Sequence, residues 1–338
     1  MNTFFAHWRA RLALGVLLAL AGPAIAANEA SASAPAVTVA VSAALNKDAV
    51  CTRCHDESET KPLLSIYQTR HGVKADSRTP SCQSCHGASG QHVAGGKGTG
   101  NASRPAPEVV FKTRSAVNPA SAALVQSDTC MACHKGGKRL HWDASQHQGQ
   151  DLPCAACHSV HVKHDPVLAK ATQAEVCFAC HKTERAQTHR LSTHPIDAGK
   201  MACTDCHNPH GSVGPKLLVK NSVNETCATC HAEKRGPFLW EHQPVSDDCS
   251  NCHTPHGSVN TALLKARPPF LCQACHSGDH GAQVNSGANL GGGAVTTVNG
   301  LNPLANAAAR AQLGARACLN CHVLVHGSNH PAGAKFQR

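Results

Sequence analysis

Ten copies of the motif Cys-x-x-Cys-His run through the chain and use all 20 of its cysteines. Two thiols and a histidine at this spacing are typical of the covalent attachment of c-type haem. The thiols predicted to form the thioether bonds are Cys51, Cys54, Cys82, Cys85, Cys130, Cys133, Cys154, Cys157, Cys177, Cys180, Cys203, Cys206, Cys227, Cys230, Cys249, Cys252, Cys272, Cys275, Cys318 and Cys321. The predicted proximal iron ligands are His55, His86, His134, His158, His181, His207, His231, His253, His276 and His322.

Other kinds of site also use paired cysteines, namely zinc ribbons, thioredoxin-like redox pairs and disulfide frameworks. None of these requires a histidine directly after the second cysteine, whereas every pair in this chain has one. No cysteine is left over for a disulfide or a structural zinc ion. The sequence therefore favours ten covalent haems.

The first residues have the pattern of a secretory signal peptide. Arg9 and Arg11 precede an apolar run over residues 12–20, and Ala24-Ile25-Ala26 is a small-residue cleavage site. The apolar run is shorter than the roughly 20 residues of a membrane-spanning helix. We therefore expect a cleaved signal peptide over residues 1–26, export to the periplasm and no transmembrane helix.

After the signal peptide we expect a flexible leader over residues 27–48 and a decahaem domain over residues 49–338, with only about 31 residues for each motif. A protein core of this length normally buries more large apolar side chains than this chain has. The aromatic residues after the signal peptide are Tyr67, Phe111, Trp142, Phe178, Phe238, Trp240, Phe270 and Phe336. The predicted fold class is a multihaem cytochrome c, an elongated stack of ten haems within mostly coil and short α-helices, with almost no sheet. Its porphyrins supply the core, so the chain is not expected to fold without haem.

The motifs pair into five units that begin near residues 51, 130, 177, 227 and 272. In each unit one histidine precedes the second motif and one follows it. These histidines are the predicted distal iron ligands: His71, His92, His147, His161, His194, His210, His242, His256, His280 and His326. We interpret the four remaining histidines as surface residues that could replace a wrongly predicted distal ligand: His141, His164, His189 and His330. The closest alternatives are His330 in place of His326 and His141 in place of His147.

If histidine binds both sides of every iron, the ligands also predict the kind of function. Methionine is nearly excluded as a ligand, because Met1 leaves with the signal peptide, Met131 lies inside a motif and Met201 lies just before Cys203. Bis-histidine haems have low potentials and no open position for a substrate. We expect an electron carrier rather than an enzyme. The histidine between two motifs is expected to serve the first haem of its own unit, and the histidine after the second motif a neighbouring haem.

Local patterns predict a few helix starts and loops. Thr172 with Glu175, and Ser222 with Glu225, have the spacing of a capping box. A helix is expected from Asn302-Pro303 to about Cys318. The stretches 92–126 and 278–300 are expected to be surface loops.

The formal net charge of +10 would suit a nucleic-acid-binding protein. The basic residues are scattered along the chain, however, and ten haems would add twenty negatively charged propionates. We therefore expect no nucleic-acid partner.

The ten motifs behind a signal peptide, with repeated Cys-x-x-Cys-His-x-Pro-His-Gly, resemble the periplasmic decahaem cytochromes of the MtrA/DmsE/PioA/MtoA family. The resemblance extends from Cys51 to His326. It implies a haem wire inside an outer-membrane β-barrel porin, with the Cys51 end toward the periplasm and the Cys318 end outward. The partners it implies are that porin, periplasmic or inner-membrane cytochromes, and an extracellular multihaem cytochrome.

The function implied by the resemblance is extracellular electron transfer, either in metal reduction or in iron oxidation. Two other functions stay open: a soluble periplasmic electron shuttle or store, and a multihaem reductase of a small oxyanion. The reductase would need an iron with an open position, and the sequence has no Cys-x-x-Cys-Lys variant of the kind found in pentahaem nitrite reductases.

Overall fold

The computed structural model describes residues 47–73, 76–95, 104–113, 116, 119–276 and 318–337. The predicted signal peptide, nearly all of the predicted leader, His280 and the stretch 302–317 lie outside the described residues. All ten motifs lie within them.

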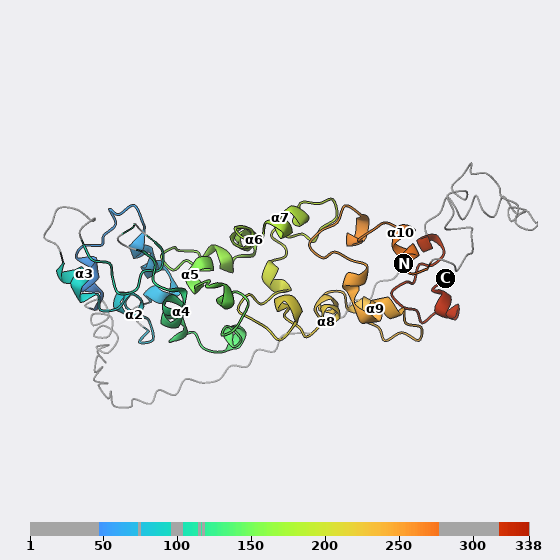
Figure 1. The fold of residues 1–338 in the computed structure, drawn as a ribbon, viewed down its shortest axis with the longest axis horizontal. Coiled ribbons are helices and arrows are strands. Elements are labelled where there is room, and N and C mark those ends of the chain that lie inside the picture. The colour runs from blue at the N-terminus through green and yellow to red at the C-terminus, as the bar shows by residue number, and fades with distance from the viewer. Residues whose placement is uncertain are drawn as a thin grey trace, which may run out of the picture.

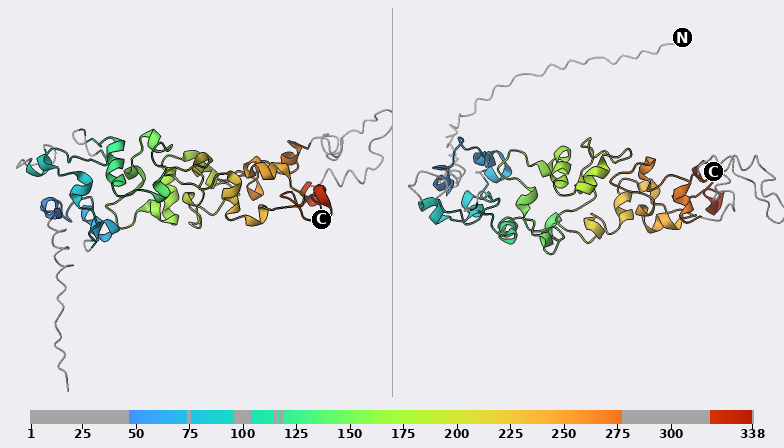
Figure 2. Two further views of the ribbon diagram at one scale, coloured as in Figure 1. Left: turned by 90° about the horizontal axis from the view of Figure 1, so that it is seen from below. Right: turned by 45° about the horizontal axis from the view of Figure 1, so that its top comes forward.

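The described chain is elongated, and its motif units follow one another along the long axis in sequence order (Figure 1). Two further views show the same narrow outline (Figure 2). The predicted elongated arrangement is thus confirmed.

The regular structure consists of short helices, the longest of which have nine residues among those described. Residues 47–52 are helical. The further α-helices are α2 (Cys82–His86), α3 (Gly90–Ala94), α4 (Ala123–Met131), α5 (Cys154–Cys157), α6 (Lys170–Phe178), α7 (Lys182–Thr188), α8 (Val223–Ala228), α9 (Gln243–Asp247) and α10 (Phe270–Gln273). Short 3-10 helices lie between them: η1 (Leu63–Gln68), η2 (Arg70–Gly72), η3 (Gly137–Arg139), η4 (Gln148–Gln150), η5 (Pro166–Leu168), η6 (Cys203–Asp205), η7 (Pro215–Leu217), η8 (Ala232–Lys234), η9 (Cys249–Asn251), η10 (Thr261–Leu263), η12 (Cys318–Asn320) and η13 (Gly333–Lys335).

Extended pairing within the described ranges is limited to isolated antiparallel bridges, so the expectation of almost no sheet is confirmed. Two bridges join successive units, and two close a loop behind a motif histidine. The bridges are Ser192 with Ser258, Trp240 with Ser328, His207 with Leu218, and His253 with Leu264.

The protein core is very small. The buried apolar residues of the described chain are Val110, Trp142, Ala174, Phe178 and Ala202. Each large side chain among them contributes about 1.5–3 kcal/mol, whereas ordering one residue's backbone costs about 1–2 kcal/mol. The polypeptide alone therefore cannot offset its own ordering, which agrees with a core completed by porphyrins.

The two predicted helix caps have different outcomes. Ser222 caps α8, because its hydroxyl accepts a hydrogen bond from the Glu225 N–H at 3.1 Å. The capping box at Thr172 is wrong, since α6 already begins at Lys170. The Thr172 hydroxyl instead donates to the Pro166 carbonyl oxygen at 2.6 Å and ties α6 to η5.

The expectation of a surface loop over residues 92–126 is wrong in part. Helices α3 and α4 occupy its two ends. Between them Val110 is buried, and the Glu108 carboxylate accepts a hydrogen bond from the Ser89 N–H at 2.9 Å. The segment 104–113 packs back against the first unit because, as described below, its carbonyls hold two histidines of that unit.

Candidate haem sites

Each motif folds into one tight turn. In nine motifs the histidine N–H donates to the carbonyl of the first cysteine, as from His207 to Cys203 at 2.9 Å. In the remaining motif, residues Cys82–His86 form helix α2. All twenty cysteines are free thiols and half-buried or exposed, which leaves them available for thioether bonds.

Nine motif histidines each face a second imidazole, with ring centroids 5.9–6.3 Å apart. A metal–imidazole bond is about 2 Å long and the ring centre lies about 1 Å further, so two rings on one metal have centres roughly 6 Å apart. The observed spacing therefore fits one iron between each pair. The pairs are His55 with His92, His86 with His161, His134 with His71, His158 with His210, His181 with His147, His207 with His256, His231 with His194, His253 with His326, and His276 with His242.

The partner imidazole in every pair is one of the predicted distal histidines. The tenth predicted distal residue, His280, lies outside the described residues. Of the two alternative distal ligands, His141 is disfavoured, because it is His147 that faces the motif histidine His181. His330 accepts a hydrogen bond at Nδ1 from the Ala332 N–H at 3.1 Å, so its ring proton lies on Nε2, the nitrogen that would otherwise bind a metal.

The expected pairing is wrong for the histidines that lie between two motifs. These residues face the first motif of the following unit rather than of their own: His71, His147, His194 and His242. The histidines after a second motif face the second motif of the preceding unit, a neighbour as expected: His161, His210, His256 and His326. His92 faces His55 of its own unit, at the end of the array.

The reason for this crossing is that the two motifs of one unit are already in contact. Their first cysteines lie within hydrogen-bonding reach of each other, so the intervening histidine extends toward the next unit. The contacting thiols are Cys51 with Cys82, Cys130 with Cys154, Cys177 with Cys203, Cys227 with Cys249, and Cys272 with Cys318.

The second cysteines connect one unit to the next. Burial raises the pKa of the Cys85 thiol, and the nearby Cys133 thiolate raises it further. The same neighbour relation holds for Cys157 with Cys180, Cys206 with Cys230, and Cys252 with Cys275. First and second cysteines thus alternate in linking all ten motifs in sequence order, and porphyrins attached to them would form one unbroken line.

Backbone carbonyls orient nine of the imidazoles. A ring that donates its Nδ1–H keeps Nε2 for a metal, and such a partner fixes the ring orientation. The acceptors are the carbonyl oxygens of Val109 for His86, Pro105 for His92, Pro209 for His147, Leu63 for His161, Pro255 for His194, Lys216 for His207, Val325 for His242, Ala262 for His253 and Lys335 for His322, at 2.6–3.0 Å. Sequence reasoning missed these residues, because any residue type can supply a carbonyl.

The Pro-His-Gly element has two roles. The Pro209 carbonyl accepts the His147 Nδ1–H at 2.8 Å, while the adjacent His210 faces His158, so one element contributes to two different imidazole pairs. Gly211 follows with φ of +104°, and a Cβ there would overlap the carbonyl oxygen of His141. Only glycine allows this close backbone approach.

Burial keeps several distal imidazoles neutral. It lowers the pKa of His210 to about 4 and is also the main cause of the lowered pKa values of His256 and His326. A neutral imidazole is the form that binds a metal.

Comparison with known proteins gives matches along most of the chain. The family model described as Cytochrome c-type protein NrfB-like matches residues 82–172, and the model described as Doubled CXXCH motif matches residues 194–236 and 242–281. The multiheme cytochrome MtrA of Shewanella baltica (strain OS185) is 45% identical over 292 residues, which cover 85% of this chain and 80% of the relative. The chain belongs to the MtrA family of multihaem cytochromes.

A more distant relative is the cytochrome c-type protein NrfB of Haemophilus influenzae, which is 26% identical over 171 residues, or 44% of this chain and 72% of that protein. Family membership confirms the resemblance predicted from the motifs, together with c-type haem binding and a role in electron transfer. In the part of the chain that the structure describes, no helix is long and apolar enough to cross a membrane.

Proposed function

We propose that this MtrA-family chain is a decahaem electron carrier in which two histidines ligate each of ten irons. The observation that carries the proposal is the set of nine imidazole pairs with room for one iron between the rings. By elimination among the predicted ligands, the tenth iron would lie between the last motif histidine, His322, and the remaining predicted distal histidine, His280.

Bound haem would supply a one-electron couple at each site. The chain's own residues would fix the order of the haems and the orientation of their ligands. The alternating cysteine contacts fix the order of the porphyrins, and the carbonyl acceptors hold the imidazoles in place. Because neutral histidine would occupy both faces of the iron, no substrate could bind there, so we propose a carrier and not an enzyme.

The elongated outline and the MtrA-family relationship support a more specific role. We place the chain in the periplasm, inside an outer-membrane β-barrel porin, as the wire between periplasmic or inner-membrane cytochromes and the cell exterior. An extracellular multihaem cytochrome would be the outer partner. Metal reduction and iron oxidation would use the same path in opposite directions.

The test is purification of the full-length, haem-loaded chain from its own host through a C-terminal tag. The proposal predicts recovery from detergent-solubilised outer membranes in a 1:1 complex with a porin. Recovery from the soluble periplasmic fraction alone would contradict the barrel and favour an electron shuttle or store. Nitrite or another small oxyanion turned over by the purified chain would contradict the carrier role.

A further inference from the structure

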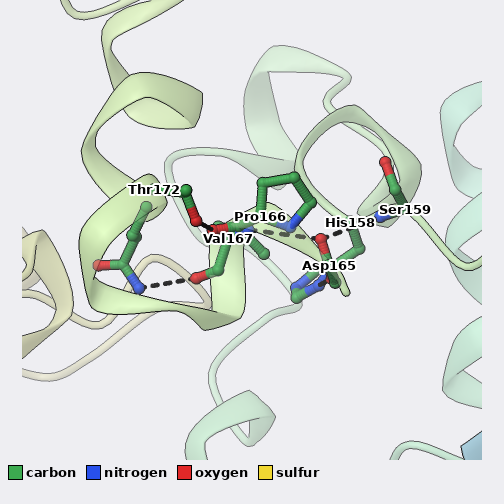
Figure 3. Close-up of polar contacts among 7 residues, drawn as sticks. His158, Ser159, Asp165, Pro166, Val167 and Thr172 are labelled. Atoms are coloured by element: carbon green, nitrogen blue, oxygen red, sulfur yellow. Dashed lines mark hydrogen bonds and ion pairs between the residues drawn. The ribbon is translucent and has the colours of Figure 1, made fainter. Parts of the chain in front are cut away.

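The haem site formed by His158 and His210 differs from the others in the partner of its motif histidine. The Nδ1 atom of His158 lies 2.7 Å from Oδ2 of Asp165, so a carboxylate takes the place of the usual carbonyl (Figure 3). The Asp165 side chain is only 12% exposed. Among the described motif histidines, His55 also has a carboxylate within hydrogen-bonding distance, that of Glu59, but there both side chains are about one-third exposed. The carboxylates of Glu184 and Glu233 lie near the Nδ1 atoms of two more motif histidines, at 3.7 and 3.9 Å, which is beyond hydrogen-bonding distance.

The carboxylate of Asp165 is held in position by the fold. Its Oδ1 accepts hydrogen bonds from the N–H groups of Ser159 and Val167, at 3.3 and 3.4 Å, and caps η5. Helix α6 fixes η5 in turn, because Thr172 donates to the Pro166 carbonyl and Gln173 to the Val167 carbonyl (Figure 3). The contact with His158 is therefore a built feature of the unit and not a mobile surface ion pair.

The following units offer an internal comparison. At the corresponding second motifs, His207 donates Nδ1–H to the Lys216 carbonyl at 3.0 Å and His253 to the Ala262 carbonyl at 2.8 Å. The ring atom is the same and only the acceptor differs. An ionised acceptor forms the stronger hydrogen bond and makes the imidazole a more basic ligand.

The imidazole on the other side of this site, that of His210, has no carboxylate partner at Nδ1. The Nδ1 atom of His210 is buried and has no hydrogen-bond partner. Its ring lies against the edge of the buried Trp142, at a centroid distance of 6.3 Å. The added electron donation to this haem would thus come from the His158 side alone.

We propose that Asp165 is a positioning residue that lowers the reduction potential of the haem at Cys154–His158 below that of its counterpart at Cys203–His207. This inference rests on the proposed function, because His158 and His210 must ligate iron. Reduction adds one electron from the adjacent haem and converts ferric to ferrous iron, with no bond broken and the proton retained between Nδ1 and the carboxylate. A more basic imidazole stabilises the ferric form. The haem line would therefore contain a step in potential within its N-terminal half.

The test compares the full-length haem-loaded protein with its Asp165→Asn variant by spectroelectrochemical titration. The asparagine carbonyl can still accept the His158 Nδ1–H, as Lys216 does for His207, so ligation is kept. Outer partners of metal-bound histidine typically change affinity or activity by 10–100-fold. We expect one component of the titration to shift about tenfold in its ferric–ferrous equilibrium, which is 59 mV upward for one electron.

The matched control is Asp248→Asn. Asp248 also caps a 3-10 helix, accepting from the Ser250 N–H at 2.6 Å, and the same charge is lost near another motif. An Asp165→Asn titration that coincides with the Asp248→Asn titration would overturn the inference.

A second measurement does not require Asp165→Asn to fold. In Glu59→Gln, where His55 has lost its carboxylate, magnetic resonance should resolve one low-spin haem with a stronger ligand field than the rest. Low-spin centres that are all alike would overturn the role of Asp165 while leaving bis-histidine ligation intact. A high-spin centre in the spectra of the wild type and of both variants would instead overturn the proposed function itself.

Discussion

His210 and His158 lie 6.0 Å apart between ring centroids and only 10° from parallel, although they belong to different motif units. The same crossing recurs in both directions along the described chain. Every interior unit thus offers imidazoles to its neighbours and faces imidazoles from them. The haems and the polypeptide are therefore expected to form one cooperative structure rather than five independent modules.

Replacement of His210 by methionine tests this crossing directly. Methionine as an axial ligand raises the potential of c-type haem, and the axial ligands together span about 0.8 V. We expect His210→Met to raise one component by on the order of 0.1 V, as measured by redox titration. His164 is exposed, so His164→Met should leave the titration unchanged; a shift of equal size in that control would contradict the assignment.

The last haem should depend on His280. His330 is the alternative in the sequence, but its Nδ1 accepts the Ala332 N–H. We expect His280→Ala to convert one of ten haems from low spin to high spin, and His330→Ala to leave all ten low spin. Electron paramagnetic resonance of the ferric proteins distinguishes the two results. The reverse outcome would show that His330, and not His280, is the distal ligand of the tenth iron.

Protein made without haem attachment should not fold. The described chain buries five apolar residues, of which only Val110, Trp142 and Phe178 are large. We expect the exported apo-chain to lack a cooperative transition in a urea titration followed by circular dichroism. A cooperative transition in the apo-chain would mean that the polypeptide has a core independent of the porphyrins.

Asp205 gives a stability that depends on pH. The Ala202 N–H, and then Lys170, hold the pKa of its carboxyl below the usual value. A lowered pKa in the folded state stabilises above the unfolded pKa of about 3.9 and loses that effect as pH falls below it. Asparagine keeps an acceptor for the Ala202 N–H but loses the charge paired with Lys170, so we expect Asp205→Asn to cost about 0.5 kcal/mol at pH 7. The difference in Tm from wild type should shrink below about pH 4.

The exposed Asp151 provides the control for Asp205. Its φ of +54° is also tolerated by asparagine, so Asp151→Asn should show a Tm difference that is small at every pH. A Tm difference for Asp205→Asn that stayed constant from pH 7 to pH 3 would contradict the role of its charge.

Much of the candidate site could be predicted because the attachment motif is a local pattern. Covalent chemistry fixes three positions within five consecutive residues, and the repeat then indicates further histidines such as His92 and His326. In the structure nine of the ten predicted distal histidines face a motif histidine, while their ligation stays a prediction.

The remaining features depend on contacts between residues distant in sequence. His147 could not be assigned to His181 without knowing that motifs of one unit touch through their first cysteines. The acceptor for His86 is the backbone carbonyl of Val109, a group that every residue type has, so the sequence predicts only a loop over residues 104–113. Asp165 resembles any surface aspartate until His158 is seen beside it.

If imidazole binds both faces of every iron, every ferric haem of the protein is low spin. Electron paramagnetic resonance of the purified, fully oxidised, full-length protein, with its iron content determined in parallel, counts the centres in each spin state. We expect ten irons per chain, all low spin. A high-spin signal equivalent to one iron or more would contradict this expectation.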